Sequence, residues 1–190
     1  MGLMLSQRPE ADALLDRDPL ALVIGMVLDQ QVPLEKAFSG PWVLAERLGH
    51  VPDAVEIAGM PEDDLVAIFS KPPALHRFPG SMAKRVQAMC VAVVERYDND
   101  VRNVWAGAAD GKELLRRVGA LPGFGTQKAQ IFVALLGKQY GVTPPGWREA
   151  AGEYGPDGTY KSVADITDAQ SLGNVREYKK QMKAAARAKP

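Results

Sequence analysis

Cysteine and histidine are scarce in this chain of 190 residues, which holds one cysteine and two histidines. The single thiol, Cys90, can form no disulfide within the chain and cannot supply the four thiolates of an iron–sulfur cluster. His50 and His76 lack the spacing of metal ligands, and we expect both at the surface or in turns. We therefore expect no iron–sulfur cluster and no other resident cofactor.

Long apolar runs are also missing. The longest, residues 20–28, is too short to span a bilayer, and the first residues lack the basic-then-apolar pattern of a signal peptide. Apolar residues nevertheless make up 46% of the chain, which is enough to bury a core in one domain or in two small lobes. The sequence predicts a soluble, monomeric, cytoplasmic protein with no membrane partner.

The chain has no net charge, which at first argues against a nucleic-acid partner. The total conceals an asymmetry, because residues 1–70 hold 4 Lys and Arg against 12 Asp and Glu. Residues 71–140 hold 11 against 5, and residues 141–190 hold 8 against 6. The positive middle third could present one face to phosphates, although chance clustering of solvated charges explains the counts equally well.

No segment alternates as a strand does, whereas helical periodicity with start and stop signals recurs through residue 140. Asp18 and Pro19 form an N-cap and first position for an apolar helix to Leu28, which should lie at the centre of the core. The other expected helices cover residues 34–48 with a disturbance near 39–41, a short segment from 61, 81–97 with Ser81 as N-cap, 112–118, 127–140 and 174–188. The predicted fold class is all-α.

The C-terminal part divides into two sections. Residues 143–160 are rich in glycine and proline, and their pattern does not predict a path. Residues 174–188 carry basic side chains three or four positions apart, which is more often typical of a solvated helix than of a DNA clamp. We assign residues 1–142 to a helical domain and residues 143–190 to an extension packed on that domain.

The last two expected helices of this domain form a hairpin over residues 112–140. Their connection is Leu121-Pro122-Gly123-Phe124-Gly125, in which one residue separates two glycines. Gly123 and Gly125 remove Cβ atoms that would block the approach of another backbone. The loop amides and the following helix N-terminus form an anion site suited to a DNA phosphate, and Lys128 adds a positive charge. A plain helix–turn–helix corner would also explain two glycines, but the leucine-rich helix before them and Ala129 after them make the pattern more specific.

With these flanks the sequence resembles the helix-hairpin-helix (HhH-GPD) superfamily of base-excision-repair DNA glycosylases. Residues 18–31 look like the opening core helix of that family with its glutamine-bearing turn, and residues 78–86 look like the start of a later helix. The hairpin and residues 143–149 also look like a small bacterial subfamily of unassigned activity. The resemblance spans about two-thirds of the chain and implies a two-lobed helical fold, with double-stranded DNA of the bacterial nucleoid as partner.

The resemblance also implies that the DNA bends and that the target nucleotide flips into a cleft between the lobes. Gln31 matches a position from which some relatives insert a side chain into the vacated stack, and a solvent-exposed glutamine at a helix end is an equally good interpretation. The implied DNA contacts are Gln31, Ser81, Lys84, Gly123, Phe124, Gly125, Thr126, Gln127 and Lys128. Hairpins of the family also hold a monovalent cation, sodium or potassium, through main-chain oxygens that correspond to Gly119, Leu121 and Phe124.

The sequence departs from the family where catalysis is concerned. Glycosidic cleavage passes through an oxocarbenium-like state that a nearby carboxylate stabilises. Residues 145–147 stand at the distance from Gln127 where the family has an aspartate, and none of them is acidic. The nearest carboxylate, Glu149, is the candidate catalytic residue, with a surface or capping role as the alternative. Gln127 itself stands where bifunctional relatives have a Schiff-base lysine, so we expect no lyase activity.

Three further side chains near the hairpin complete the predicted site. One helical step turns a side chain by about 100°, so Lys128 should point away from the surroundings of Gln127 and contact a phosphate. Trp147 and Tyr154 are expected at the base pocket, where aromatic rings stack on a flipped base, although both could equally anchor a loop.

The leading hypothesis from the sequence is a monofunctional DNA glycosylase homologue. The first alternative is a non-catalytic DNA-binding protein of the same fold that has lost the catalytic aspartate. A protein-interaction module that reuses the fold is a second alternative.

Overall fold

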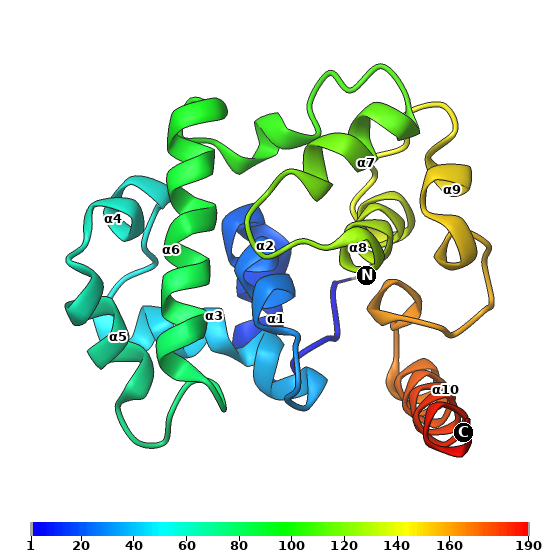
Figure 1. The fold of residues 1–190 in the computed structure, drawn as a ribbon, viewed down its shortest axis with the longest axis horizontal. Coiled ribbons are helices and arrows are strands. Elements are labelled where there is room, and N and C mark those ends of the chain that lie inside the picture. The colour runs from blue at the N-terminus through cyan, green and yellow to red at the C-terminus, as the bar shows by residue number, and fades with distance from the viewer. Residues whose placement is uncertain (1, 190) are drawn as a thin grey trace.

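The structure is a computed structural model that describes residues 2–189, and within that range it contains helices and no β-strand (Figure 1). The prediction of an all-α protein is confirmed. The elements are α1 (Pro9–Arg17), α2 (Pro19–Leu28), α3 (Leu34–Leu48), α4 (Ala54–Gly59), α5 (Glu62–Ser70), α6 (Pro79–Arg96), η1 (Val101–Val104), α7 (Gly111–Gly119), α8 (Thr126–Gln139), α9 (Trp147–Ala150), η2 (Gly152–Tyr154), η3 (Val163–Asp165) and α10 (Ala169–Ala188), where η marks a short 3-10 helix.

The apolar helix α2 lies at the centre of the core, as its sequence predicts. Every residue from Leu20 to Leu28 is buried. The side chain of Asp18 accepts hydrogen bonds from the amides of Leu20 and Ala21, at 2.9 and 3.2 Å, so the predicted N-cap is confirmed. In Figure 1, α4, α5 and α6 lie on one side of α2, and α7, α8 and α9 lie on the other.

Several helix boundaries differ from the prediction. Helix α3 continues through Pro41 without the expected disturbance and ends at Gly49, whose φ of +81° stops it. Helix α6 begins at Pro79, so Ser81 lies in its first turn and the prediction of Ser81 as N-cap is wrong. Helix α10 begins five residues before the predicted start because Asp168 and Ser171 form a reciprocal capping box.

The segment between α8 and α10 lies against α8. The ring of Trp147 covers Gly137 so closely that a Cβ there would lie 2.3 Å from ring carbons, and the amide of Gly111 donates to the carbonyl of Pro145. Further along, the ammonium of Lys138 and the carboxylate of Asp165 form a buried ion pair at 2.6 Å. These contacts determine the path of residues 143–165, which the glycine and proline content of the sequence does not predict.

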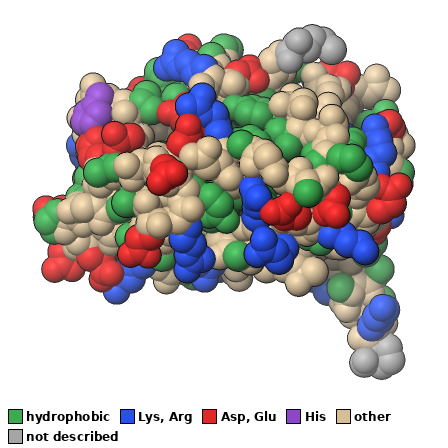
Figure 2. All heavy atoms as spheres, turned by 90° about the horizontal axis from the view of Figure 1, so that it is seen from above, with side chains coloured by type: hydrophobic (Ala, Val, Ile, Leu, Met, Phe, Trp, Pro, Cys, Tyr) green, Lys and Arg blue, Asp and Glu red, His purple; other side chains and the backbone are tan. Residues whose placement is uncertain are grey.

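Helix α10 packs on the body of the protein through its first turns only. Ser171, Leu172 and Val175 are its buried residues, and every residue from 180 to 188 is exposed. Figure 2 shows the final turns projecting beyond the rest of the molecule, at the lower right. Across residues 2–189, no helix is both long enough and apolar enough to cross a membrane.

Candidate nucleic-acid interface

The turn between α7 and α8 is held from within. The amide of Leu121 donates to the carbonyl of Val118, and the amide of Phe124 donates to the carbonyl of Leu121, both at 3.1 Å. Leu121 and Phe124 are buried, and the Phe124 ring lies 5.6 Å from that of Phe132. The Phe124 side chain therefore anchors the hairpin and is not free to contact DNA, so only its main chain remains available to a ligand.

The two hairpin glycines serve different purposes. Gly123 has a φ of +91°, which a residue with a Cβ adopts only under strain, and a Cβ there would meet the side chains of Arg85 and Val27 at 3.1–3.3 Å. The atoms closest to Gly123 thus belong to side chains, whereas we expected the sequence to bring another backbone close to this glycine. At Gly125 the φ is −81°, and apart from its chain neighbours no atom lies within 4 Å of the position that a Cβ would occupy. Nothing within the described chain requires glycine at position 125, and its surface is open to another molecule.

The N-terminus of α8 is open as well. Gly125 occupies the N-cap position and offers no side chain to the first amides of the helix. Thr126 and Gln127 are exposed. The first turn of a helix leaves amide N–H groups without partners and carries the positive end of the helix dipole, so this end can receive an anion such as a phosphate.

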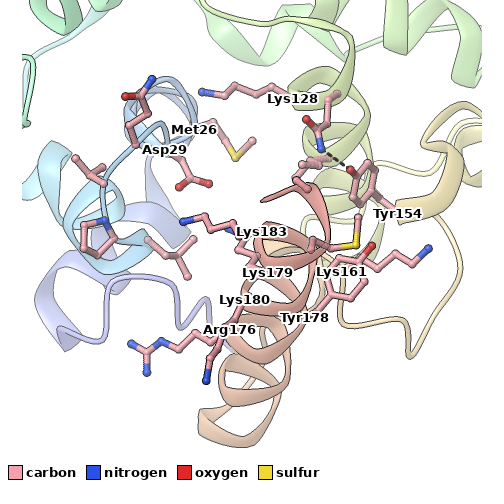
Figure 3. A pocket seen from close by; sticks show the side chains of 18 of the residues that line it. Met26, Asp29, Lys128, Tyr154, Lys161, Arg176, Tyr178, Lys179, Lys180 and Lys183 are labelled. Atoms are coloured by element: carbon pink, nitrogen blue, oxygen red, sulfur yellow. Dashed lines mark hydrogen bonds between the residues drawn. The ribbon is translucent and has the colours of Figure 1, made fainter. Parts of the chain in front are cut away.

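A cleft of about 1400 Å³ begins beside this helix end (Figure 3). Its walls come from the α2–α3 turn, the start of α8, the segment around η2 and the inner side of α10. Three carboxylates line it, and the basic residues that line it are Arg77, Lys128, Lys161, Arg176, Lys179, Lys180, Lys183 and Arg187. Six of these eight lie outside the middle third of the chain, so the positive surface of the cleft does not follow from the charge count by segment.

Gln127 and Lys128 both line the cleft. The Gln127 amide donates to the hydroxyl of Tyr154 at 2.8 Å on one wall, and the Lys128 ammonium reaches the carbonyl of Val27 at 3.3 Å on the opposite wall. The Lys128 side chain therefore runs in the opposite direction from that of Gln127, although both residues line the same cleft (Figure 3). Burial lowers the pKa of Lys128, and the charge of Asp29 partly opposes that effect.

The turn after α2 presents Gln31 at the mouth of the cleft. Gln31 is exposed and has a φ of +56°, a conformation that non-glycine residues seldom adopt. Under the turn lies His76, whose Nε2 faces the carbonyls of Leu28 and Gln30 at 3.1 and 3.0 Å. Its Nδ1 accepts a hydrogen bond from the amide of Phe78, which fixes the neutral Nε2–H form of the ring.

The two histidines differ from each other in burial. His50 is exposed and pairs with Glu56, as a surface residue does. His76 lies in the turn between α5 and α6, as one of the two predicted alternatives has it, but its side chain is only 1% exposed, so the prediction of a surface position is wrong. The error arises because its partners lie 46 and 48 residues away in the sequence, beyond the reach of any local pattern.

The buried position of His76 gives a testable dependence on pH. Desolvation lowers the pKa of His76 in the folded protein below the ordinary value of 6.5. The unfolded chain therefore binds more protons, and the free energy of unfolding should fall as the pH drops from about 7 through 6.5 toward the lower folded-state pKa. Urea unfolding between about pH 5 and pH 8 in a His50→Gln background measures this, since His50 titrates with a raised pKa. Adding His76→Gln should flatten the curve, and an unchanged slope would contradict the assignment.

The remaining predicted site residues divide between the cleft and other places. Tyr154 is buried to 5% exposure and lines the cleft beside Gln127. Trp147 is buried between α7 and α8 and does not line it, so its observed contacts are those of a loop anchor. Ser81 and Lys84 also lie outside the cleft lining, and Lys84 pairs with Glu62 at 3.1 Å.

The carboxylates that line the cleft do not include Glu149, the candidate catalytic residue from the sequence. Glu149 is exposed on α9 and does not line the cleft. Glu153 does, but it pairs with Lys161 at 2.9 Å. Asp29 follows α2 directly and points into the cleft between Lys128 and Lys183 (Figure 3). Its only signal in the sequence is its place beside the glutamine turn, which spacing from the hairpin could not reveal.

The predicted cation site at the hairpin stays a prediction. The carbonyl of Leu121 already accepts the amide of Phe124. Between residues 2 and 189, no group of three or more His, Cys, Asp or Glu side chains is placed to hold a metal ion.

Comparison with known proteins adds no assignment. No protein-family model matches the chain, and no curated protein or solved structure matches it either.

Proposed function

We propose that this protein binds duplex DNA with the hairpin and cleft, in the manner of a two-lobed helix-hairpin-helix DNA glycosylase. The observation that carries the proposal is that α8, whose N-terminus is open to an anion, leads directly into a basic cleft. A phosphate would take the amides around Gly125, and the flipped nucleotide would enter between Gln127, Tyr154 and Lys128. Gln31, exposed at the mouth, is the candidate to fill the vacated position in the stack.

The cleft offers suitable groups for a flipped base. Tyr154 presents an aromatic ring and a hydroxyl, and its hydrogen bond to the Gln127 amide fixes both side chains. An aromatic face can stack on a base while the amide and hydroxyl pair with its polar edge. The volume of about 1400 Å³ is ample for a nucleotide with part of its strand.

We further propose hydrolysis of the N-glycosidic bond with Asp29, rather than Glu149, as the catalytic carboxylate. Within residues 2–189 no hydrogen bond or ion pair engages the Asp29 side chain, and Asp29 lines the cleft opposite Gln127 and Tyr154. A carboxylate there would stabilise the developing positive charge on the sugar and orient a water molecule. The predicted outcome is a free base and an intact abasic strand, because Gln127 cannot form a Schiff base.

Release of free base from duplexes with alkylated, oxidised, deaminated or mismatched bases tests the chemistry. Asp29→Asn should lower the rate of base release from any duplex that the unchanged protein cleaves by at least roughly a hundredfold, which is the usual cost of losing acid–base catalysis. Glu149→Gln is the matched control and should retain activity. The reverse result would show that the assignment of Asp29 is wrong.

A second candidate function differs only in the chemistry. If no duplex releases base while DNA binding persists, the protein is a non-catalytic DNA-binding member of the same fold. The absence of an aspartate at residues 145–147 favours this candidate.

A further inference from the structure

Helix α10 carries a row of four basic residues on the side that faces the cleft, namely Lys179, Lys180, Lys183 and Arg187. Arg176 pairs with Glu35 across the mouth of the cleft. By contrast, no ion pair within residues 2–189 engages Lys179, Lys180, Lys183 or Arg187, although all four line the cleft. Four like charges at helical spacing repel one another, so their gathering on one wall is unfavourable unless an anionic partner neutralises them.

We propose that α10 is the second wall of the DNA site and holds phosphates of the same duplex that the hairpin grips. This inference rests on the proposed function and extends it to a helix that the sequence alone favours as merely solvated. Lys183 extends from α10 toward α2 across the cleft, facing the same space as Lys128 (Figure 3).

The dimensions of the row fit a nucleic-acid strand. Lys179 and Arg187 are separated by about eight residues of helix, which is about 12 Å. Along that length of duplex one strand carries about three to four phosphates, since each occupies about 3.4 Å of the axis. The row and the strand therefore have similar length and opposite charge.

The shape of the surface favours DNA over a membrane. The cations face a concave cleft that α8 also lines, and a flat bilayer cannot enter such a hollow. The apolar side chains that α10 adds are few, namely Tyr178, Met182 and alanines. A helix that lies in a membrane interface instead needs a broad apolar face.

Helix α10 is attached to the body of the protein at its N-terminal end, and its later turns are exposed. Its first turns are held by the capping box at Asp168 and by Leu172 and Val175, which are buried. Beyond Arg176 the helix has few contacts with the body, so its charges can follow a bound strand without disturbing the core. For the same reason, neutral substitutions from residue 179 onward should leave the fold unchanged.

The test is the salt dependence of duplex binding by a variant with Lys179→Gln, Lys180→Gln, Lys183→Gln and Arg187→Gln. Each phosphate contact contributes about 0.9 to the magnitude of the slope of log K against log salt, so removing four contacts should lower that magnitude by about 3.6. Affinity should fall by roughly a hundredfold at about 0.1 M salt. The matched control removes four exposed charges outside the cleft, with Arg8→Gln, Arg17→Gln, Lys71→Gln and Lys112→Gln, and should change the slope by less than about 1.

Equal slopes for the α10 variant, the control and the unchanged protein would overturn the inference while leaving the proposed function in place. Failure of the unchanged protein to bind duplex would instead overturn the proposed function, and the inference with it. Loss of binding to phosphatidylserine vesicles in the α10 variant, with an unchanged slope on DNA, would overturn the inference in favour of a membrane surface.

Discussion

Asp165→Asn is expected to lower the melting temperature by roughly 10 °C. The side chains of Lys138 and Asp165 are 7% and 4% exposed, and their charged atoms lie 2.6 Å apart. The second carboxylate oxygen of Asp165 accepts a hydrogen bond from the amide of Lys161 at 3.0 Å. Asparagine keeps the shape but leaves the Lys138 ammonium buried without a counter-ion, which costs about 3–5 kcal/mol.

The control for this prediction is Asp157→Asn. Asp157 pairs with Arg148 at 3.0 Å, but both side chains are largely exposed. Removing that pair should cost less than about 1 kcal/mol. Calorimetry of the two variants decides the matter, and equal melting temperatures would contradict the burial of the Lys138–Asp165 pair.

The consequence for function is that this ion pair positions α10. Asp165 ends η3, and α10 begins four residues later. Because Lys138 belongs to α8, the pair connects the helix that carries Gln127 to the segment that carries the cations of α10. The Asp165→Asn variant should therefore also bind DNA more weakly at temperatures where it remains folded.

Gly125→Val is expected to weaken duplex binding at least roughly tenfold while lowering the free energy of unfolding by no more than about 1 kcal/mol. The φ of −81° suits valine, and apart from the chain neighbours no atom lies within 4 Å of the position that a Cβ would occupy, so the fold can accept the side chain. In the proposed complex, however, the branched side chain would occupy the space through which a phosphate reaches the amides of α8.

Gly123→Ala is the contrasting variant. At a φ of +91°, with Arg85 and Val27 in the way, alanine strains the turn and should cost about 1–3 kcal/mol of stability. Loss of binding by this variant would not separate misfolding from loss of contact. Anisotropy titrations with a labelled duplex, combined with urea unfolding, test Gly125→Val directly, and unchanged affinity would contradict the role of the hairpin.

The elements that the sequence predicts well are those with local causes. The Asp18 cap and the apolar run define α2, and the glycine hairpin with its flanking helices defines α7 and α8. Helices α1 and α4 were not predicted. Helix α4 has only six residues and α1 has no side-chain N-cap, so both depend on the burial of a few residues such as Leu14 and Ile57. The path between α8 and α10 depends on contacts such as Lys138 with Asp165, 27 residues apart, which no local pattern encodes.

The site follows the same division. The position of Gln127 beside the hairpin is local, and the structure places it at the cleft with Tyr154. The contact that Lys128 makes is not local, because its long side chain reaches the carbonyl of Val27 on another helix, 101 residues away in the sequence. The contact between η3 and the first turns of α10 likewise determines which side of α10 faces the cleft. The spacing of the charges in the sequence does not predict that orientation.

Whether the cleft beside the hairpin holds DNA can be measured through the affinity of the unchanged protein for two duplexes over a range of salt concentrations. One duplex is intact, and the other carries a stable abasic-site analogue, which removes the cost of unpairing a base. We expect tighter binding to the duplex with the abasic-site analogue, with a slope of log K against log salt of magnitude about 4 or more. Binding that is absent, or that does not change with salt, would contradict this expectation.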